Sequence, residues 1–155
     1  TASLAEWLGP FIAGKKRITD IHPTELTQAL NARLDPRLRE TLEREAPDRI
    51  TVPSGSRKKL DYAAGDRPIL AVRLQELFGL KNTPRIAGGR VPVLLHLLSP
   101  AERPVQITDD LASFWQTTYE RVKKDLKGRY PKHHWPDDPL AAAPTRSTKR
   151  KRSRK

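Results

Sequence analysis

Residues 83–139 read TPRIAGGRVPVLLHLLSPAERPVQITDDLASFWQTTYERVKKDLKGRYPKHHWPDDP, and this stretch decides the fold. It contains, in order, the longest apolar segment of the chain, a turn, a second short extended segment, an amphipathic segment and an aromatic peptide rich in proline. This order predicts strands and a helix that share one apolar side. Because that side has to be covered, we expect the remaining residues to pack around this unit.

Residues 90–98 predict the strongest strand, which is bounded by a Gly-Gly pair and a Ser-Pro pair. Apolar side chains occupy both of its faces, at Leu94, Leu95, Leu97 and Leu98. A strand that is apolar on both faces is typical of the centre of a sheet. Pro92 is compatible with the first positions of a strand, where a ladder hydrogen bond can be missing. The turn that follows leads to a partner strand at residues 104–107.

Residues 109–127 predict a helix with an aromatic stripe on its buried face. The apolar residues of that face follow steps of three and four apart from one neighbouring pair, at Leu111, Phe114, Trp115, Tyr119, Val122 and Leu126. Thr108 is placed to cap this helix, and acidic residues occupy its first turn. Gly128 is placed to end it. We expect this helix to cover the sheet.

The first 47 residues predict a helical subdomain. Residues 3–13 place apolar side chains on one helical face, but Pro10 leaves open whether they form one helix or two short turns. Two further helices are predicted to start at Pro23 and at Asp35-Pro36, and Pro47 ends the second of them. The side chains expected to point inward from these helices are Leu26, Leu30, Leu34, Leu38 and Leu42.

Residues 48–62 alternate at period two around a Pro-Ser-Gly-Ser turn and predict a hairpin. Residues 68–80 have leucines at helical spacing with Gly79 placed as a C-cap, while residues 68–72 fit an extended conformation equally well. The predicted fold class is therefore α+β. It comprises an N-terminal helical subdomain at 1–47, a small, mostly antiparallel sheet with covering helices at 48–139, and a disordered polybasic tail at 140–155.

The charge balance points to a polyanionic partner. The 155 residues include 30 Lys and Arg against 18 Asp and Glu, for a formal net charge of +12. Seven of these cations follow Thr145 with no acid among them, so the preceding residues have a net charge of only +5. Such an excess favours nucleic acid as a partner, because neutralised phosphates release condensed counterions. A basic tail kept for solubility explains the same composition.

Several classes of protein are excluded or disfavoured by composition. The absence of cysteine excludes disulfides and thiolate metal sites. No apolar run approaches the roughly 20 residues of a membrane span, so we expect no membrane partner and a cytoplasmic location. The chain also lacks methionine, even at residue 1, and we therefore expect it to be a piece of a longer polypeptide.

Candidate nucleic-acid contacts gather after Glu120, in the helix, the aromatic peptide and the tail. They are Arg121, Lys123, Lys124, Lys127, Arg129, Lys132, Arg146, Lys149, Arg150, Lys151, Arg152, Arg154 and Lys155. In residues 129–139, aromatic rings lie beside cations, a combination that can stack unpaired bases and pair with their phosphates. The same rings, Tyr130 and Trp135, can instead pin the exit of the chain to the core.

Metal binding and catalysis are not predicted. His133 and His134 lie close to Asp137 and Asp138, but neighbouring residues of an extended chain point in opposite directions and rarely share one ion. His96, in the apolar strand, is predicted to be a core histidine. Neither the Gly-Gly pair nor the Ser-Gly-Ser turn forms a phosphate loop or a GxGxxG turn. We therefore expect no catalytic residue, no metal and no cofactor in these residues.

Several longer segments resemble the C-terminal region of the HrpB family of bacterial DEAH/DExH-type ATP-dependent RNA helicases. They are VPSGSR at 52–57 followed by Asp61-Tyr62, LAVRLQELFGL at 70–80, TPRIAGGRVPVLLHLLSP at 83–100, RPVQITDDLASFW at 103–115 and GRYPKHHWPDDP at 128–139. The resemblance covers most of residues 3–139 and leaves out the basic tail. A match over several such segments is more specific than any short motif.

The resemblance implies a parent protein with two RecA-like motor domains, which hold the ATP site, its Mg²⁺ and the RNA track. Its phosphate loop and DExH box lie in that motor, so none of these features falls on a residue of this chain. The expected function is that of a non-catalytic accessory domain that contacts RNA through basic residues, with the motor domains of the same polypeptide as a partner. The alternative is a protein-interaction or structural module that braces the motor or recruits a partner.

Overall fold

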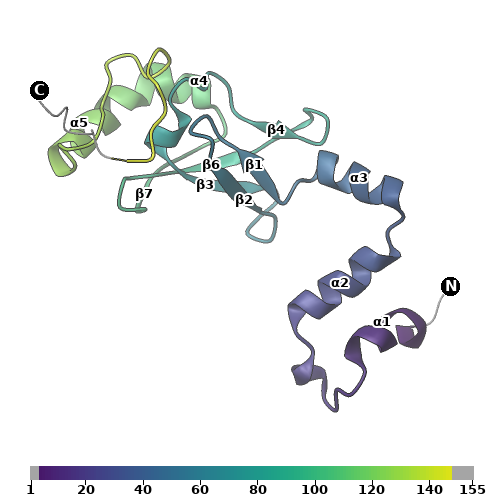
Figure 1. The fold of residues 1–155 in the computed structure, drawn as a ribbon. Helices are drawn as coiled ribbons and strands as arrows, with labels where there is room; N and C mark the ends of the chain where they lie inside the picture. Colours follow the sequence, from purple (N-terminus) through teal and green to yellow (C-terminus); the bar gives the residue numbers. More distant parts are fainter. Residues whose placement is uncertain (1–3, 148–155) are drawn as a thin grey trace, which may run out of the picture. The chain divides into compact units, whose positions relative to one another are not determined.

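The computed structural model describes residues 4–147 of the chain. It divides into two compact units, one that ends at Arg44 and one that starts at Glu45. We call them the helical unit and the sheet unit and describe each by itself (Figure 1). Residues 148–155, which belong to the predicted tail, lie outside the described residues. The predicted domain boundaries at 47/48 and 139/140 stay predictions.

The helical unit contains α1 (Leu4–Ile12), a short 3-10 turn (Ile18–Asp20), α2 (Pro23–Arg33) and most of α3 (Pro36–Glu45). Pro10 lies inside a single α1, which settles the question that the sequence left open. The Asp35 carboxylate caps α3 by accepting a hydrogen bond from the Leu38 amide at 2.8 Å.

The leucines predicted to point inward do not form the core of the helical unit. Leu26 is 38% exposed, and Leu30 and Leu38 are each 55% exposed. The buried side chains described in this unit are instead those of Leu8 in α1 and Ala29 in α2, and these two helices pack against each other. The periodicity located the helices, but it did not show how few side chains such a small unit can bury.

The sheet unit is built on a five-stranded sheet in the order β1-β2-β3-β6-β7. Its strands are β1 (Arg49–Thr51), β2 (Arg57–Asp61), β3 (Ile69–Arg73), β6 (Leu94–Leu98) and β7 (Pro104–Thr108). Only the β3–β6 pair is parallel. The predicted α+β class with a mostly antiparallel sheet is therefore confirmed, as are the 48–62 hairpin and the central position of the apolar strand.

Two predicted elements have different bounds in the structure. The strand expected at 90–98 is interrupted at Val93, whose amide donates to the Pro84 carbonyl at 3.0 Å. The residues before this break form β5 (Val91–Pro92), which pairs with β4 (Arg85–Ile86) in a separate ribbon. Residues 68–80 follow the extended alternative at first, as β3, and then form only one 3-10 turn, η2 (Leu74–Leu77).

The aromatic helix begins and ends later than predicted and is not uniform. It consists of α4 (Leu111–Ser113), a π-helical turn, η3 (Phe114–Thr118), and α5 (Tyr119–Arg129). The cap is Asp110 rather than Thr108, because the Asp110 carboxylate accepts from the Ser113 amide at 3.0 Å. The helix continues through Gly128, and the Tyr130 amide still donates to the Leu126 carbonyl at 2.7 Å.

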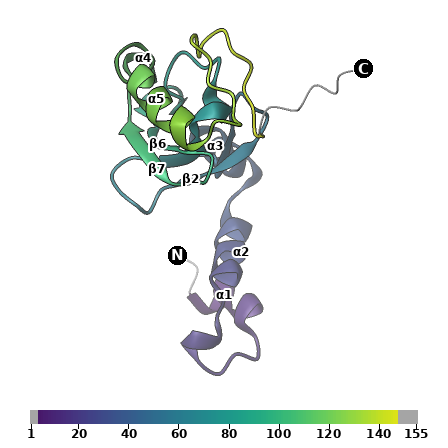
Figure 2. The same cartoon turned by 90° about the vertical axis from the view of Figure 1, so that its left-hand side faces the viewer.

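The π-helical turn explains the irregular step in the aromatic stripe. Phe114 and Trp115 are neighbours, yet they are only 4% and 7% exposed. The wider turn allows both rings to face the core, where their centroids lie 5.1 Å apart. The Trp115 indole N–H also donates to the Leu80 carbonyl at 2.8 Å. The core therefore lies between the sheet and this helix, and the helices of the unit lie on one side of the sheet (Figures 1 and 2).

Candidate nucleic-acid interface

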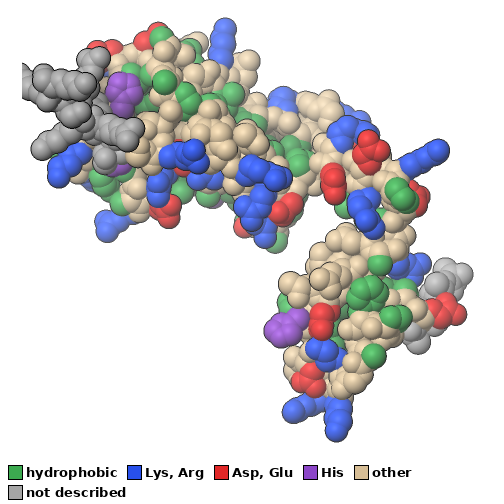
Figure 3. Space-filling model, in the orientation of Figure 1, with side chains coloured by type: hydrophobic (Ala, Val, Ile, Leu, Met, Phe, Trp, Pro, Cys, Tyr) green, Lys and Arg blue, Asp and Glu red, His purple; other side chains and the backbone are tan. Residues whose placement is uncertain are grey.

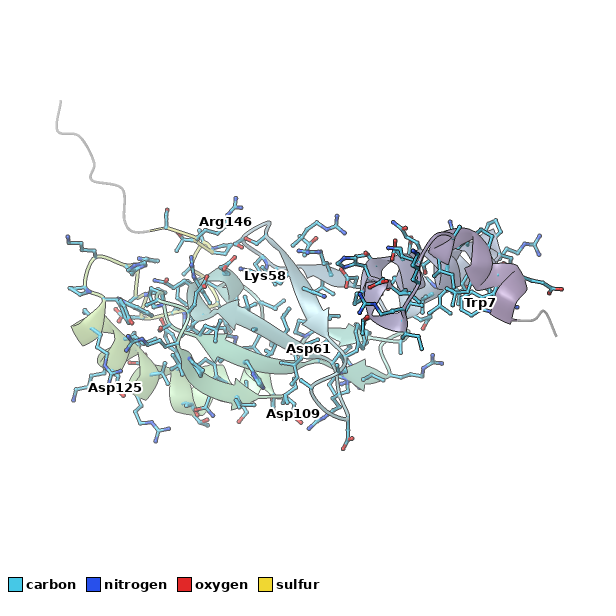
Figure 4. The ribbon with its side chains drawn as sticks, turned by 90° about the horizontal axis from the view of Figure 1, so that it is seen from below. Trp7, Lys58, Asp61, Asp109, Asp125 and Arg146 are labelled. Atoms are coloured by element: carbon cyan, nitrogen blue, oxygen red, sulfur yellow. The ribbon has the colours of Figure 1, made fainter. Side chains whose placement is uncertain are left out.

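The sheet unit exposes many Lys and Arg side chains, as the face seen in Figure 3 shows. Four of the predicted contact residues on α5 are exposed, namely Arg121, Lys124, Lys127 and Arg129. The helix is held by Val122 and Leu126, which are 5% and 4% exposed and face the core. Because residues four apart lie on the same side of a helix, Arg121 and Arg129 share a face with Asp125, labelled in Figure 4.

A groove of about 350 Å³ lies between α5 and the start of β7. It is lined by Ser99, Arg103, Pro104, Val105, Gln106, Arg121, Val122, Asp125, Leu126, Arg129 and Tyr130. Arg103 belongs to the β6–β7 turn, which is closed by the Ser99 amide donating to the Arg103 carbonyl at 2.8 Å. The Arg103 amide in turn donates to Ser99 Oγ at 3.1 Å. We call this site the arginine groove, after Arg103, Arg121 and Arg129.

The arginine groove is unbalanced in charge. Within residues 4–147, the guanidinium groups of Arg103, Arg121 and Arg129 have no ion pair and no hydrogen bond. Asp125 is the one carboxylate in the lining. Other arginines of the sheet unit are paired with carboxylates, such as Arg73, which lies 2.6 Å from Glu102, and Arg67, which lies 2.6 Å from Asp109. Three unpaired guanidinium groups around one groove form a site suited to an anion.

Lys123 does not contribute to this site, because other residues of the chain neutralise it. Its Nζ lies 2.7 Å from Glu120 Oε1 and 3.0 Å from Asp137 Oδ1, and its side chain is only 12% exposed. The hydrogen bond to Glu120 raises the pKa of Lys123, and the bond from Lys123 lowers the pKa of Asp137. Among the predicted contact residues that fall within 4–147, Lys123 is therefore the one whose charge is neutralised by ion pairs within the chain.

The remaining predicted contacts lie at several places. Arg129 and Lys132 line a second, smaller hollow of about 260 Å³ with Tyr130, Pro131 and His133. Arg146 is exposed at the end of the described chain, on the same side of the sheet unit as Lys58 in Figure 4. The other tail residues of the prediction, Lys149, Arg150, Lys151, Arg152, Arg154 and Lys155, lie outside the described residues.

The aromatic peptide that follows α5 pins the chain to the core. Trp135 is 8% exposed, and its indole N–H donates to the Tyr130 carbonyl at 2.9 Å. The Tyr119 hydroxyl donates to the Pro136 carbonyl at 2.8 Å, and burial raises the pKa of Tyr119 far above its ordinary range. The path continues to Thr145, whose amide donates to the Gln75 carbonyl at 3.0 Å. The alternative in which this peptide pins the exit of the chain to the core is therefore confirmed for Trp135.

His134 of this peptide is held against the core. The His134 carbonyl accepts from Gln75 Nε2 at 3.0 Å, and the His134 ring packs edge-on against Phe78. Burial, followed by the nearby Arg73 charge, lowers the pKa of His133. Among residues 4–147 no group of three or more His, Asp or Glu side chains is arranged to hold a metal ion.

Sequence reasoning missed Arg103 and Gln106 as members of the groove. Arg103 lies in a turn well before the helix, and no local pattern links it to α5. The one sequence feature that could have indicated Arg103 is its position immediately before the predicted partner strand at 104–107. Arg121 and Arg129, which the sequence did single out, are brought together with Arg103 by the packing of α5 against the sheet.

The structure and the comparisons together define an α+β domain from the C-terminal part of a helicase. The sequence model of the ATP-dependent helicase C-terminal family matches residues 7–139, and this chain belongs to that family. It is similar to the ATP-dependent RNA helicase HrpB of Escherichia coli strain K12, with 49% identity over 149 residues. These residues make up 96% of this chain but only 18% of that relative.

Two solved structures have the same fold. The crystal structure of the E. coli DExH-box NTPase HrpB is 49% identical, with a TM-score of 0.82 over 94% of this chain and 18% of that one. The crystal structure of the Escherichia coli DEAH/RHA helicase HrpB is 45% identical, with a TM-score of 0.64 over 84% of this chain and 17% of that one. The chain thus spans about a fifth of the length of these relatives. Within the described part of the chain, no helix is long and apolar enough to cross a membrane.

Proposed function

We propose that this chain is the C-terminal accessory domain of a cytoplasmic ATP-dependent RNA helicase and that it holds RNA in the arginine groove. The observation that carries the proposal is the convergence of Arg103, Arg121 and Arg129 on one open groove without a described partner. ATP, Mg²⁺ and the chemistry of hydrolysis belong to motor domains in the rest of the polypeptide. The role of this chain is to bind the strand that the motor moves.

The groove suits the backbone of RNA better than its base edges. Guanidinium groups match phosphate oxygens in geometry and charge and can bind them in pairs. Contacts of this kind position a strand without reading its sequence. A motor that moves along RNA needs an accessory contact that tolerates any sequence. Tyr130, half-buried at the end of the groove, offers an aromatic ring against which an unpaired base can pack.

The cations around the groove extend the same surface. Lys124 and Lys127 are exposed on α5, and Lys132 follows in the aromatic peptide. Long-range attraction by such a surface raises the rate of encounter with a polyanion and falls as salt increases. The tail after Thr145 adds seven more cations to the chain. In this arrangement the tail collects RNA and the groove sets its path.

Filter binding of single-stranded RNA across a salt series tests the proposal. The chain is compared with a variant carrying Arg103→Gln, Arg121→Gln and Arg129→Gln, and both are also prepared without residues 148–155 to separate the tail from the groove. Each lost phosphate contact is expected to reduce the slope of log affinity against log salt by about 0.7. We therefore expect the salt slope of the triple variant to be smaller by about 2 than that of the unaltered chain.

The matched control carries Arg37→Gln, Arg57→Gln and Lys59→Gln, which removes the same charge from exposed positions outside the groove. Its salt slope is expected to fall much less than that of the groove variant. Equal losses in the two variants would show that net charge alone binds RNA. Millimolar affinity without any salt dependence in the unaltered chain would contradict the proposal outright.

A further inference from the structure

The sheet has a second face, which turns away from the core and the helices. Strand register identifies its side chains, because Leu70 and Leu95 pair on the core side while Ile69 pairs with Leu94 and His96 with Ile107 on the other. Along β3, β6 and β7, the outward residues with small or apolar side chains or a histidine are Ile69, Ala71, Leu94, His96, Leu98 and Ile107. We call them the outer strip. The prediction of His96 as a core histidine is therefore wrong, because strand alternation turns it away from the core. Among residues 45–147 of the sheet unit, no helix lies on this side (Figures 1 and 4).

The outer strip is apolar where a sheet of this kind should be polar. A mostly antiparallel sheet with one solvated face normally alternates between apolar residues inside and polar residues outside. β1 and β2 follow this rule, because their outward residues include Arg49, Arg57 and Lys59, all exposed. The strip departs from it, and Ile107 is 53% exposed to solvent. Contiguous apolar patches on a protein surface are common at interaction sites.

The strip is edged by charged residues, as the centre of a protein–protein interface is. Arg73 ends β3 on this face and lies 2.6 Å from Glu102 of the β6–β7 turn. Arg67 precedes β3 and lies 2.6 Å from Asp109, which follows β7 and is labelled in Figure 4. Interfaces combine an apolar centre with a polar, solvent-accessible rim. These cations are already paired, so the rim is not a site for a polyanion.

The chemistry of the strip points to a protein partner. Sheet faces that bind single-stranded RNA stack its bases on aromatic rings. The outer strip has no Phe, Tyr or Trp, and His96 is its one ring. Aliphatic side chains are stabilised instead by another apolar surface that excludes water. The rest of the same polypeptide is the surface that we consider, because more than four fifths of each matched relative lies outside the region that this chain matches.

We propose that the outer strip docks this domain onto the rest of the helicase polypeptide to which it belongs. The inference rests on the proposed function for the existence of that polypeptide, but it concerns a different face from the arginine groove. The groove residues on α5 lie on the helix side of the sheet, and the strip lies on the other side. Docking through the strip therefore leaves the groove open to RNA while the sheet fixes its position relative to the motor.

A photo-crosslinker tests the docking. Benzoylphenylalanine is placed at position 107 of the full-length polypeptide and, as the matched control, at position 51, an exposed outward residue of β1. We expect position 107 to crosslink to peptides of the same polypeptide that lie outside residues 1–155, and position 51 to do so far less. Crosslinks to a second copy, identified by mixing isotope-labelled and unlabelled protein, would overturn the inference. Crosslinks to RNA, or a yield at position 107 no higher than at position 51, would also overturn it.

A charge substitution gives an independent measure. Ile107→Glu places a carboxylate in the strip, and Thr51→Glu places one on the same face beyond it. We expect Ile107→Glu to accelerate proteolytic release of this domain from the full-length polypeptide at least threefold, with no change for Thr51→Glu. RNA binding by residues 1–155 should be unchanged in both variants, so a failure here is distinct from a failure of the groove. Equal release rates for Ile107→Glu and the unaltered polypeptide would contradict docking through the strip.

Discussion

Lys58 Nζ lies 2.7 Å from Glu76 Oε1, although the Glu76 residue is only 1% exposed. The other carboxylate oxygen accepts from Ser54 Oγ at 2.9 Å, and the Ser54 amide donates to the Glu76 carbonyl at 3.2 Å. The pair thus joins the turn between β1 and β2 to the 3-10 turn η2. A buried carboxylate has to be paired and hydrogen-bonded, and this one is.

The first prediction is that Glu76→Gln destabilises the sheet unit by about 2 kcal/mol, because it leaves the Lys58 ammonium without its counter-charge. The expected value lies below that of a fully buried pair because the Lys58 side chain is 28% exposed. Urea unfolding of the chain measures it. Asp66→Asn, at an exposed turn position, is the control and should leave the unfolding midpoint unchanged. A Glu76→Gln midpoint equal to that of the control would contradict the prediction.

The second prediction concerns pH. Burial acts to raise the pKa of Glu76, but hydrogen bonds from Lys58, Ser56 and Ser54 outweigh it, so that the pKa lies below its ordinary value of 4.5. A carboxylate with a lowered folded-state pKa contributes stability that is fully present above the unfolded-state pKa and is lost as pH falls through the folded-state pKa. The unaltered chain should therefore lose its advantage in free energy of unfolding over Glu76→Gln as the pH falls from 5 to 2. If urea titrations show the same difference in free energy of unfolding over this whole range, the lowered pKa of Glu76 is disproved.

The regular part of the fold could be predicted from the sequence because it depends on local patterns. Period-two alternation located β1 and β2, and the apolar run located β6 as a central strand. The break at Val93 could not be predicted, since it depends on a hydrogen bond to Pro84 in a separate segment. The π-helical turn left a visible sign, the neighbouring Phe114 and Trp115 in an otherwise regular stripe.

The candidate site was predictable only in part, because long-range contacts are not visible in local sequence patterns. The cations of α5 stand out in the sequence, but the groove also needs Arg103, which tertiary packing brings to them. Lys123 looks like its neighbours in the sequence, and only the fold shows that Asp137 holds it. Which cations are free to bind an anion is a property of long-range contacts, and residue type alone does not determine it.

The third prediction compares two tyrosines that make the same bond in different surroundings. The Tyr119 hydroxyl donates to the Pro136 carbonyl at 2.8 Å and the Tyr62 hydroxyl to the Pro47 carbonyl at 2.8 Å. Tyr119 is 1% exposed, whereas Tyr62 is 43% exposed. Tyr119→Phe should destabilise the chain by about 1 kcal/mol, because the Pro136 carbonyl loses the donor of a partly buried hydrogen bond. Tyr62→Phe should have a smaller effect, because water replaces the hydroxyl.

Urea unfolding of both tyrosine variants provides the measurement. If Tyr62→Phe is as destabilising as Tyr119→Phe, then burial does not control the strength of these bonds. The result also tests how the aromatic peptide is held, because Pro136 lies next to Trp135 in the segment that returns the chain to the core. Loss of the Tyr119 bond is expected to increase hydrogen exchange of that segment before the rest of the unit.

The fourth prediction separates two neighbouring cations of α5. Arg121 lines the arginine groove without a described partner, whereas Lys123 is held by Glu120 and Asp137. Arg121→Gln should weaken RNA binding and reduce the salt slope by about 0.7, with little change in the urea midpoint. Lys123→Gln should lower the urea midpoint, because Glu120 and Asp137 lose their partner. Its RNA binding at matched salt should stay close to that of the unaltered chain.

This pair of variants is a strict test because both changes remove one positive charge from the same helix. If binding followed net charge alone, the two variants would lose the same affinity at every salt concentration. If the groove forms the contact, only Arg121→Gln loses a phosphate partner, and the difference between the variants shrinks as salt screens the contact. A larger loss of RNA binding for Lys123→Gln than for Arg121→Gln would show that RNA displaces Glu120 and Asp137 from Lys123, and the strand would then have to follow the opposite side of α5.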